Sequence, residues 1–203
     1  MIMITIVDYG MGNLGSIKNM LKRIGAKSEI TSDLDYIANA TKLLLPGVGA
    51  FDKAMLRINS DGLRQVLDRK VLLEGVPVLG ICLGMQLLTR SSEEGQIPGL
   101  GWIGATTTRF PVKPGLKVPH MGWNIVRPTR KSVLTKDLLD ESRFYFVHSY
   151  RVHVEEEEDS ILKATYDITF DAAIQHGNIY GAQFHPEKSH KFGMHLLKNF
   201  ANL

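Results

Sequence analysis

The chain has 203 residues, of which 44% are hydrophobic, and a formal net charge of +3. This size and apolar content suit one α/β domain with a sizeable core, and interspersed charges argue against a nucleic-acid-binding surface. No apolar stretch is long enough to span a membrane, and the N-terminus lacks the basic segment of an export signal. With a single cysteine, these features predict a reducing, cytoplasmic location.

Strand-like and helix-like segments alternate through the first half of the chain. Residues 2–7 form a continuous apolar run, typical of a strand buried on both faces. A glycine-rich turn follows, and apolar residues then recur at helical spacing. Further strands are expected at 27–31 and 42–45, then one or two helices over 50–73, and then an apolar strand that leads into Cys82. This order predicts an α/β fold with a single doubly wound, mostly parallel sheet.

The second half has a different pattern. Several strand-like segments lie close together between turn residues, which indicates antiparallel hairpins added to the parallel sheet. These segments are residues 103–110, 144–154, 161–166, 172–176 and 179–184. The acidic run 155–159 is predicted to be a solvated loop, and residues 189–201 are predicted to form a final helix with one apolar face.

The first turn of the chain matches a dinucleotide-binding pattern. Gly10, Gly12 and Gly15 have the Gly-x-Gly-x-x-Gly spacing between a strand and a helix, and Asp33 follows the next strand. The alternative is a tight glycine turn that matches a short pattern by chance. Because the other motifs indicate different chemistry, the dinucleotide interpretation is the less favoured one.

A nucleophile elbow is predicted around Cys82. The apolar strand ends in Gly80-Ile81-Cys82-Leu83-Gly84, and a helix-forming segment follows at once. Small flanking residues let a strand turn directly into a helix, whose N-terminus stabilises a thiolate. The alternative is a buried cysteine that packs as a small hydrophobic residue. The two glycines and the strand–helix context favour a reactive cysteine.

His185 and Glu187 are candidates for the base and for the group that orients it, since a cysteine nucleophile needs both. The strand before His185 would deliver its side chain to the carboxyl edge of the sheet, where Cys82 also emerges. Pro186 stiffens the turn, so that Glu187 can bind the imidazole ring. A histidine in the core or on the surface is the alternative.

Acyl transfer also requires hydrogen-bond donors for the oxyanion. The elbow supplies the backbone N–H of Leu83, and the loop at 46–49 is placed to supply a second donor from Val48 or Gly49. An ordinary strand-to-helix turn is the alternative for this loop. No metal or other cofactor is expected, because the histidines and the one cysteine have no metal-binding spacing.

The elbow together with His185-Pro186-Glu187 resembles the motifs of the class I (triad) glutamine amidotransferases. More narrowly, the segments 45–51, 118–124 and 145–150 are similar to those of the glutaminase subunits of imidazole glycerol phosphate synthase. The likeness covers essentially the whole chain. It implies a flavodoxin-like fold and a single amidotransferase domain over residues 1–203.

The resemblance implies a role for each motif residue. Cys82 would attack the side-chain amide of L-glutamine, His185 would pass the proton to departing ammonia, and Glu187 would orient His185. The residues implied in substrate binding are Gly47, Gln86, Glu94, Ser149 and Tyr150. Taken singly, Gln86 could equally lie on a helix surface and Glu94 in a solvated loop.

The resemblance also implies that this chain is half of an enzyme. A (βα)8-barrel cyclase subunit would receive the ammonia and form imidazole glycerol phosphate and an aminoimidazole carboxamide ribonucleotide in histidine biosynthesis. Trp123 and Lys188 are candidates for that interface, the alternatives being a core tryptophan and a solvated lysine. Glutaminase activity of the isolated chain is expected to be low and to rise with the liganded partner.

Two alternatives remain open for the function. The segments 10–20 and 190–193 also resemble those of paralogous glutaminases that supply ammonia for amidination of an N-acetyl sugar in surface-polysaccharide biosynthesis. The partner would then be a sugar amidotransferase, although the triad chemistry would be the same. A cysteine hydrolase or peptidase on the same fold is the more remote alternative.

Overall fold

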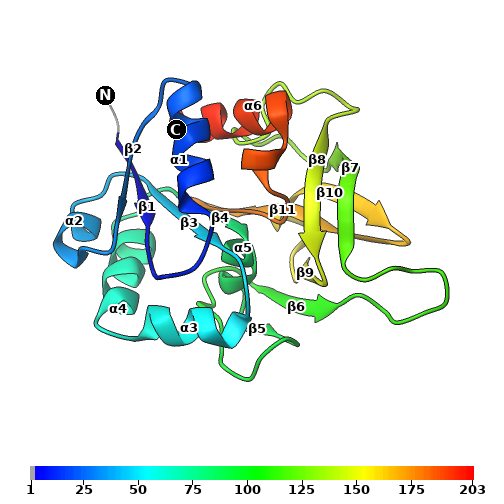
Figure 1. Ribbon diagram of the computed structural model, residues 1–203, viewed down its shortest axis with the longest axis horizontal. Coiled ribbons are helices and arrows are strands. Elements are labelled where there is room, and N and C mark those ends of the chain that lie inside the picture. The colour runs from blue at the N-terminus through cyan, green and yellow to red at the C-terminus, as the bar shows by residue number, and fades with distance from the viewer. Residues whose placement is uncertain (1–2) are drawn as a thin grey trace.

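In the computed structural model, which describes residues 3–203, each strand of the N-terminal half leads into a helix (Figure 1). The elements of this half are β1 (Met3–Val7), α1 (Leu14–Arg23), β2 (Lys27–Thr31), α2 (Leu34–Ala38), β3 (Leu43–Gly47), α3 (Phe51–Asn59), α4 (Leu63–Asp68), the π-helical turn η1 (Arg69–Leu73), β4 (Val78–Cys82) and α5 (Leu83–Leu87). The strands lie where the apolar runs predict them; residue 2 of the predicted first strand lies outside the described residues.

Strands predominate in the second half until the C-terminal helix. The elements are β5 (Ser91–Ser92), β6 (Ala105–Arg109), β7 (His120–Pro128), β8 (Arg143–His148), β9 (Tyr150–Val154), the 3-10 turn η2 (Glu157–Asp159), β10 (Ser160–Tyr166), β11 (Ile168–His176), β12 (Ile179–Ala182), the 3-10 turn η3 (Pro186–Lys188) and α6 (His190–Ala201). The single strand predicted at 144–154 is wrong, because the chain breaks at Ser149 into β8 and β9.

All of these strands join one sheet with the main order β2-β1-β3-β4-β12-β11-β10-β7-β8. Neighbouring strands from β2 to β12 run parallel, whereas β12, β11, β10, β7 and β8 pair antiparallel in succession. The predicted doubly wound sheet with added antiparallel strands is therefore confirmed. The insertion of β12 beside β4 brings the carboxyl ends of these two distant strands to the same edge.

Helices cover both faces of the parallel strands, because successive side chains of a strand point to opposite faces. Leu44 of β3 packs in the core under α1 and α6, whereas Leu43 and Leu45 pack in the core under α2, α3, α4 and α5. Figure 1 shows α1 and α6 on one side of these strands and α3, α4 and α5 on the other. Strands buried on both faces explain the continuous apolar runs in the sequence.

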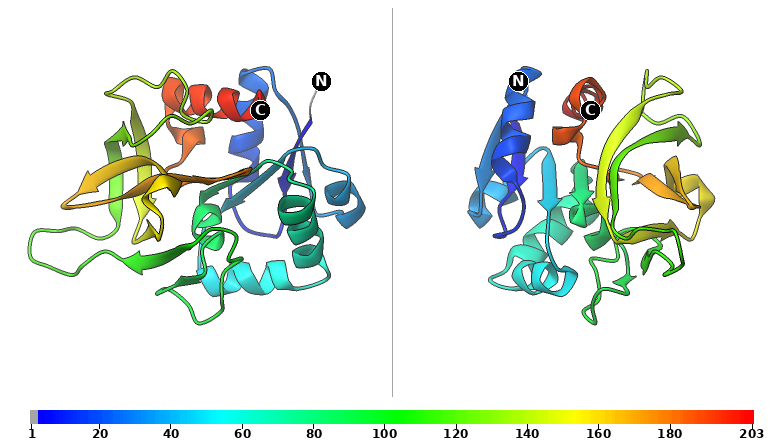
Figure 2. Two further views of the ribbon diagram at one scale, coloured as in Figure 1. Left: turned by 180° about the vertical axis from the view of Figure 1, so that it is seen from behind. Right: turned by 45° about the vertical axis from the view of Figure 1, so that its right-hand side comes forward.

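The strands of the antiparallel half are curved, as the right-hand view of Figure 2 shows, and the interior that they enclose is rich in aromatic side chains. Phe110, Phe146 and Phe170 are all at most 2% exposed, and Phe170 packs edge to face with both other rings. The ring of Phe110 also packs edge to face with His120 and His148. Edge-to-face packing adds a favourable quadrupole interaction to the burial of apolar area. Two histidines are therefore part of this core.

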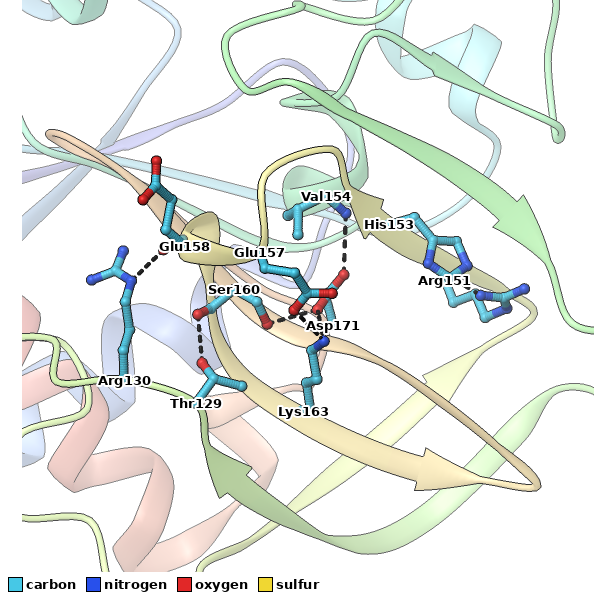
Figure 3. Close-up of polar contacts among 10 residues, drawn as sticks. All are labelled: Thr129, Arg130, Arg151, His153, Val154, Glu157, Glu158, Ser160, Lys163 and Asp171. Atoms are coloured by element: carbon cyan, nitrogen blue, oxygen red, sulfur yellow. Dashed lines mark hydrogen bonds and ion pairs between the residues drawn. The ribbon is translucent and has the colours of Figure 1, made fainter.

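A buried carboxylate ties strands of this half together (Figure 3). Asp171 of β11 is 4% exposed, and it accepts hydrogen bonds from Ser160 Oγ at 2.6 Å and from the Val154 backbone N–H at 3.1 Å. Lys163 Nζ lies 3.9 Å from the same carboxylate. These donors offset the cost of burying a charge, and they fix the end of β9 against β10 and β11.

The acidic run 155–159 is a solvated segment except at its end. Its four glutamates are exposed, but Asp159 is buried and binds His176 Nδ1 at 3.0 Å. The prediction is therefore wrong for Asp159, since tertiary packing supplies a partner that composition alone does not reveal. Among residues 3–203, every helix is too short or too polar to cross a bilayer.

Candidate active site

Cys82 sits at a sharp turn where β4 passes directly into α5. Its backbone has φ +56° and ψ −111°, an unfavourable conformation for a residue with a side chain. The flanking glycines are required by close approach: a Cβ on Gly84 would lie 1.8 Å from the Leu45 carbonyl oxygen, and one on Gly80 would lie 2.5 Å from the Gly84 carbonyl oxygen. The turn thus presents a single thiol at the carboxyl edge of the sheet.

His185 and Glu187 lie side by side at the same edge, just after β12. The Nδ1 of His185 is 2.8 Å from Glu187 Oε1, and both side chains are only 3% exposed. The short turn at Pro186 creates this pair locally, and Ser189 Oγ donates a hydrogen bond to the His185 carbonyl at 2.6 Å. The second ring nitrogen, Nε2, is buried without a hydrogen-bond partner among the described residues, so it remains free for chemistry.

The electrostatic environment keeps the His185 ring protonated. Burial by itself lowers the pKa of His185, but interactions with Cys82 and Glu187 outweigh it and raise the pKa to about 9. The Cys82 sulfur is thus close enough to affect the ring, although no hydrogen bond of good geometry joins it to Nε2. A protonated imidazole next to a sulfur nucleophile is the arrangement expected of a cysteine–histidine pair.

Cys82 and His185 open into a cavity of about 300 Å³. Nine of its lining residues are those that the sequence singled out: Val48, Gly49, Cys82, Leu83, Gln86, Glu94, Ser149, Tyr150 and His185. Three were missed: Pro119, Val147 and His148. Their segments are parts of the noted motifs at 118–124 and 145–150, but no spacing rule marks these three positions. Gly47 and Glu187 are not among the lining residues, and Trp123 and Lys188 also lie outside the cavity.

Two backbone segments beside the cavity carry the donors that the sequence predicts for an oxyanion, at Leu83 and at Val48 and Gly49. Leu83 is the first residue of α5, and helix N-termini have backbone N–H groups without an intrahelical acceptor. On the neighbouring strand, Gly47 is the register partner of Cys82, so the following residues, Val48 and Gly49, reach the cavity. The φ of +108° at Gly49 is a conformation that favours glycine.

Comparison with known proteins assigns the chain to a family. Residues 5–203 match the family model described as glutamine amidotransferase class-I. The chain belongs to this family. The family resemblance seen in the sequence is thereby confirmed, and the protein is an amidotransferase.

Similar curated proteins align with the amidotransferase over nearly its whole length. Imidazole glycerol phosphate synthase subunit HisH 2 of Methanococcus maripaludis is 54% identical, with 98% of each chain covered. The subunit HisH 2 of Pseudomonas aeruginosa is 49% identical, covering 99% of this chain and 100% of its own. The subunit HisH of Bdellovibrio bacteriovorus is 48% identical with the same coverage.

Solved structures of low sequence identity share the fold of the amidotransferase. A crystal structure of glutamine amidotransferase superimposes with a TM-score of 0.75 at 18% identity, covering 98% of this chain and 99% of the other. The structure of PurLQS from Thermotoga maritima gives a TM-score of 0.75 at 17% identity, covering 99% and 98%. These likenesses support the architecture alone.

Asp33, the candidate ribose-binding acid of the dinucleotide pattern, caps a helix in the amidotransferase. The carboxylate of Asp33 caps helix α2, accepting hydrogen bonds from the backbone N–H groups of Asp35 at 2.8 Å and Tyr36 at 3.0 Å. An acid that binds ribose must instead direct its oxygens toward the ligand. Together with the family match over 5–203, this cap argues against the dinucleotide interpretation.

Gln86 and Glu94 contribute polar groups to the cavity wall. Gln86 Nε2 donates to Gln183 Oε1 at 3.0 Å and to the Tyr150 carbonyl at 3.3 Å, which fixes the amide. Glu94 Oε2 accepts from the Phe51 backbone N–H at 3.1 Å, and burial is the main cause that raises the pKa of Glu94. Gln86 is buried, contrary to a helix-surface position, and Glu94 faces the cavity.

Two buried histidines form a hydrogen-bonded chain that starts at the cavity wall, with His148 lining the cavity and His120 behind it. The Tyr150 carbonyl can only accept, so His148 Nδ1 carries the proton of that 2.7 Å bond. His148 Nε2 then accepts from His120 Nδ1 at 2.9 Å, and His120 Nε2 accepts from the Asn124 amide at 3.3 Å. Burial lowers the pKa of His120 to about 4 and that of His148 to about 3. Both rings are therefore neutral at physiological pH and serve to order the wall.

Trp123 and Lys188 lie on the surface beside Tyr145. Trp123 is 45% exposed, with its ring stacked 5.5 Å from that of His190 and set edge-on to Tyr145 at 6.1 Å. Lys188 Nζ lies 5.8 Å from the Tyr145 ring centroid. Trp123 is thus not a core tryptophan.

Replacing Glu187 with Gln is expected to change the pH profile of catalysis. Because Glu187 helps to raise the pKa of His185 to about 9, wild-type activity should fall only above about that pH. The amide removes the charge, so the alkaline limb of kcat/KM should move down by about one pH unit, with kcat about 100-fold lower. A pH–rate profile of glutamate release measures both effects. An unchanged alkaline limb would contradict the assignment of Glu187.

Proposed function

We propose that the chain is a single glutamine amidotransferase domain that hydrolyses L-glutamine to glutamate and passes the ammonia to a cyclase subunit in histidine biosynthesis. The observation that carries this proposal is the cavity in which the thiol of Cys82, the imidazole of His185 and the carboxylate of Glu94 meet. Glu187 supports the imidazole from behind.

The proposed reaction runs through a thioester. The Cys82 thiolate attacks the side-chain amide carbon of glutamine, and the N–H groups of Leu83 and of Val48 or Gly49 stabilise the oxyanion. His185 donates its proton to the amide nitrogen, which leaves as ammonia when the carbon–nitrogen bond breaks. Water then attacks the glutamyl thioester, with His185 as the base that takes up its proton; the carbon–sulfur bond breaks, glutamate is released, and the Cys82 thiolate is restored. Glu187 stabilises the imidazolium of His185 during both thioester formation and thioester hydrolysis.

The polar groups of the cavity fit the ends of a glutamine molecule. The carboxylate of Glu94 would bind the α-ammonium group, and Gln86 with the backbone at Ser149 and Tyr150 would bind the α-carboxylate or the side-chain amide. A cavity of about 300 Å³ lies at the lower end of the range for small-ligand sites, which suits a single amino acid better than a peptide.

We propose that the partner is a (βα)8-barrel cyclase, since the curated relatives are named as subunits of imidazole glycerol phosphate synthase. On β7, Met121, Trp123 and Ile125 are 63%, 45% and 40% exposed and alternate with more buried residues. A row of large apolar side chains on a strand is typical of an interface. Lys188 lies beside it, where it would pair with an acidic residue of the partner.

The test is glutamate release by the purified protein alone and with the histidine-pathway cyclase and its ligand. Stimulation of about 10- to 100-fold is expected, as for typical coupling between two sites. Turnover that requires Cys82 but does not respond to the cyclase would overturn the histidine assignment in favour of a sugar amidotransferase partner. Absence of glutamate release under both conditions would overturn the glutaminase proposal.

A further inference from the structure

The glycine turn after β1 packs directly against the loop of residues 47–49, here named the oxyanion loop. Tyr9 is 5% exposed, and its hydroxyl donates a 2.6 Å hydrogen bond to the carbonyl of Pro46, the residue just before the loop. A Cβ at Gly47 would lie 2.5 Å from the Tyr9 hydroxyl. One at Gly49 would lie 2.8 Å from Met11 Cε. Two side chains of the turn thus contact both ends of the loop.

The Tyr9 hydroxyl lies beside the part of β3 that is no longer paired with β1. The pairing of β1 with β3 ends at Ile6 and Leu44, whereas β3 continues beside β4 as far as Gly47. Beyond Leu44, no strand of residues 3–203 therefore lies beside the edge of β3 that faced β1. The phenol supplies a donor to Pro46 in this gap, in place of a strand N–H group. Burial, assisted by the nearby Cys82, raises the pKa of Tyr9, so the hydroxyl keeps its proton and remains a donor.

We infer that Tyr9, assisted by Met11, is a positioning residue that holds the oxyanion loop beside Cys82. This inference rests on the proposed glutaminase function and gives the glycine turn a role that does not involve a nucleotide. Tyr9 is not among the residues that line the cavity, so it acts through the backbone of the loop and not on the substrate.

The expected kinetic signature follows from what the loop contacts. Donors of an oxyanion hole contact charge that develops in the transition state, so their misplacement lowers kcat more than it raises KM. Substrate-binding groups such as Gln86 and Glu94 come from other elements, and they should be unaffected. The thiol of Cys82 is held by β4 and α5, and its reactivity toward an alkylating agent should also be unaffected.

The test compares Tyr9→Phe with wild type in complex with the cyclase and its ligand. Tyr9→Phe should lower kcat about 10-fold with KM changed less than about twofold, and it should leave the rate of Cys82 alkylation by iodoacetamide unchanged. Amide hydrogen exchange at residues 47–49 should become faster. Met11→Ala, which breaks no hydrogen bond, should give the same pattern with a smaller loss of kcat. Tyr180→Phe is the matched control, since Tyr180 is also 5% exposed but its hydroxyl has only a 3.5 Å contact with Gln175.

The outcomes separate this inference from the proposed function. The inference is wrong if Tyr9→Phe has the same kcat as Tyr180→Phe and the same rate of amide hydrogen exchange at residues 47–49. It is also wrong if kcat and the alkylation rate fall together, because the effect would then be a general loss of structure. If wild type releases no glutamate, the glutaminase proposal fails, and hydrogen exchange at residues 47–49 still decides whether Tyr9 holds the loop.

Discussion

Replacing Cys82 with Ala is expected to abolish glutamate release, with a loss of about 10⁴-fold or more. The thiol supplies the only nucleophile at the elbow, and the covalent step has no route without it. The fold should persist, because the polar contacts of Cys82 Sγ, to the Val147 carbonyl and Gln183 Nε2, are weak ones at 4.0 Å. The measurement is glutamate formation over time with the cyclase and its ligand present.

Two controls separate loss of the nucleophile from loss of structure. Because the chain has one cysteine, iodoacetamide should add one label to wild type and none to the variant. The complex with the Cys82→Ala variant should still form product when ammonium salts are added at alkaline pH, because the cyclase then receives ammonia from solution. Residual glutamate release near the wild-type rate would show that another group is the nucleophile.

Replacing Gly84 with Ala is expected to destabilise the protein by about 3 kcal/mol or more and to abolish activity. The new Cβ would lie 1.8 Å from the Leu45 carbonyl oxygen. That oxygen belongs to the backbone of β3, which is paired with β4 at this point, so it cannot move aside as a flexible side chain would. Either the elbow shifts away from β3, which separates Cys82 from the oxyanion loop, or the sheet distorts. Thermal unfolding should show a decrease in Tm of about 10 °C.

Gly15→Ala is the matched control for this prediction. Gly15 and Gly84 are each the second residue of a helix, α1 and α5 respectively. A Cβ on Gly15 would have no atom within 4 Å, and alanine is the better helix former by up to about 1 kcal/mol. Gly15→Ala should therefore keep or slightly raise Tm. Similar Tm values for the two variants would contradict the steric explanation of the elbow glycine.

Features that depend on neighbours in the chain were predictable. Continuous apolar runs predicted the parallel strands, because a strand that is buried on both faces needs no polar residue. The elbow was visible because its glycines flank Cys82 directly, and the pairing of His185 with Glu187 depends on a turn of only one intervening residue. Residues that are close together in the sequence were therefore enough to predict the main chemical groups of the candidate site.

Short or half-exposed helices and strands could not be predicted, because their sequences lack a clear pattern of apolar residues. Helix α2 has five residues, too few for a helical period to show in the sequence. Strand β7 was not predicted, because exposed apolar residues, such as Met121 and Trp123, alternate in it with more buried residues, such as His120 and Asn124. Its pattern therefore lacks the usual apolar-in, polar-out contrast.

The residues that can do chemistry are recognisable from their order in the chain, whereas the folded arrangement of the strands sets which of them meet. Cys82 and His185 come together only because β12 inserts beside β4, and no local pattern predicts that insertion. The burial of His148 against His120, the pairing of Asp159 with His176, and the contact of Tyr9 with Pro46 also depend on residues that are distant in the chain. The physical reason is that periodicity and turn chemistry act over a few residues, whereas strand order follows from the burial of the whole core.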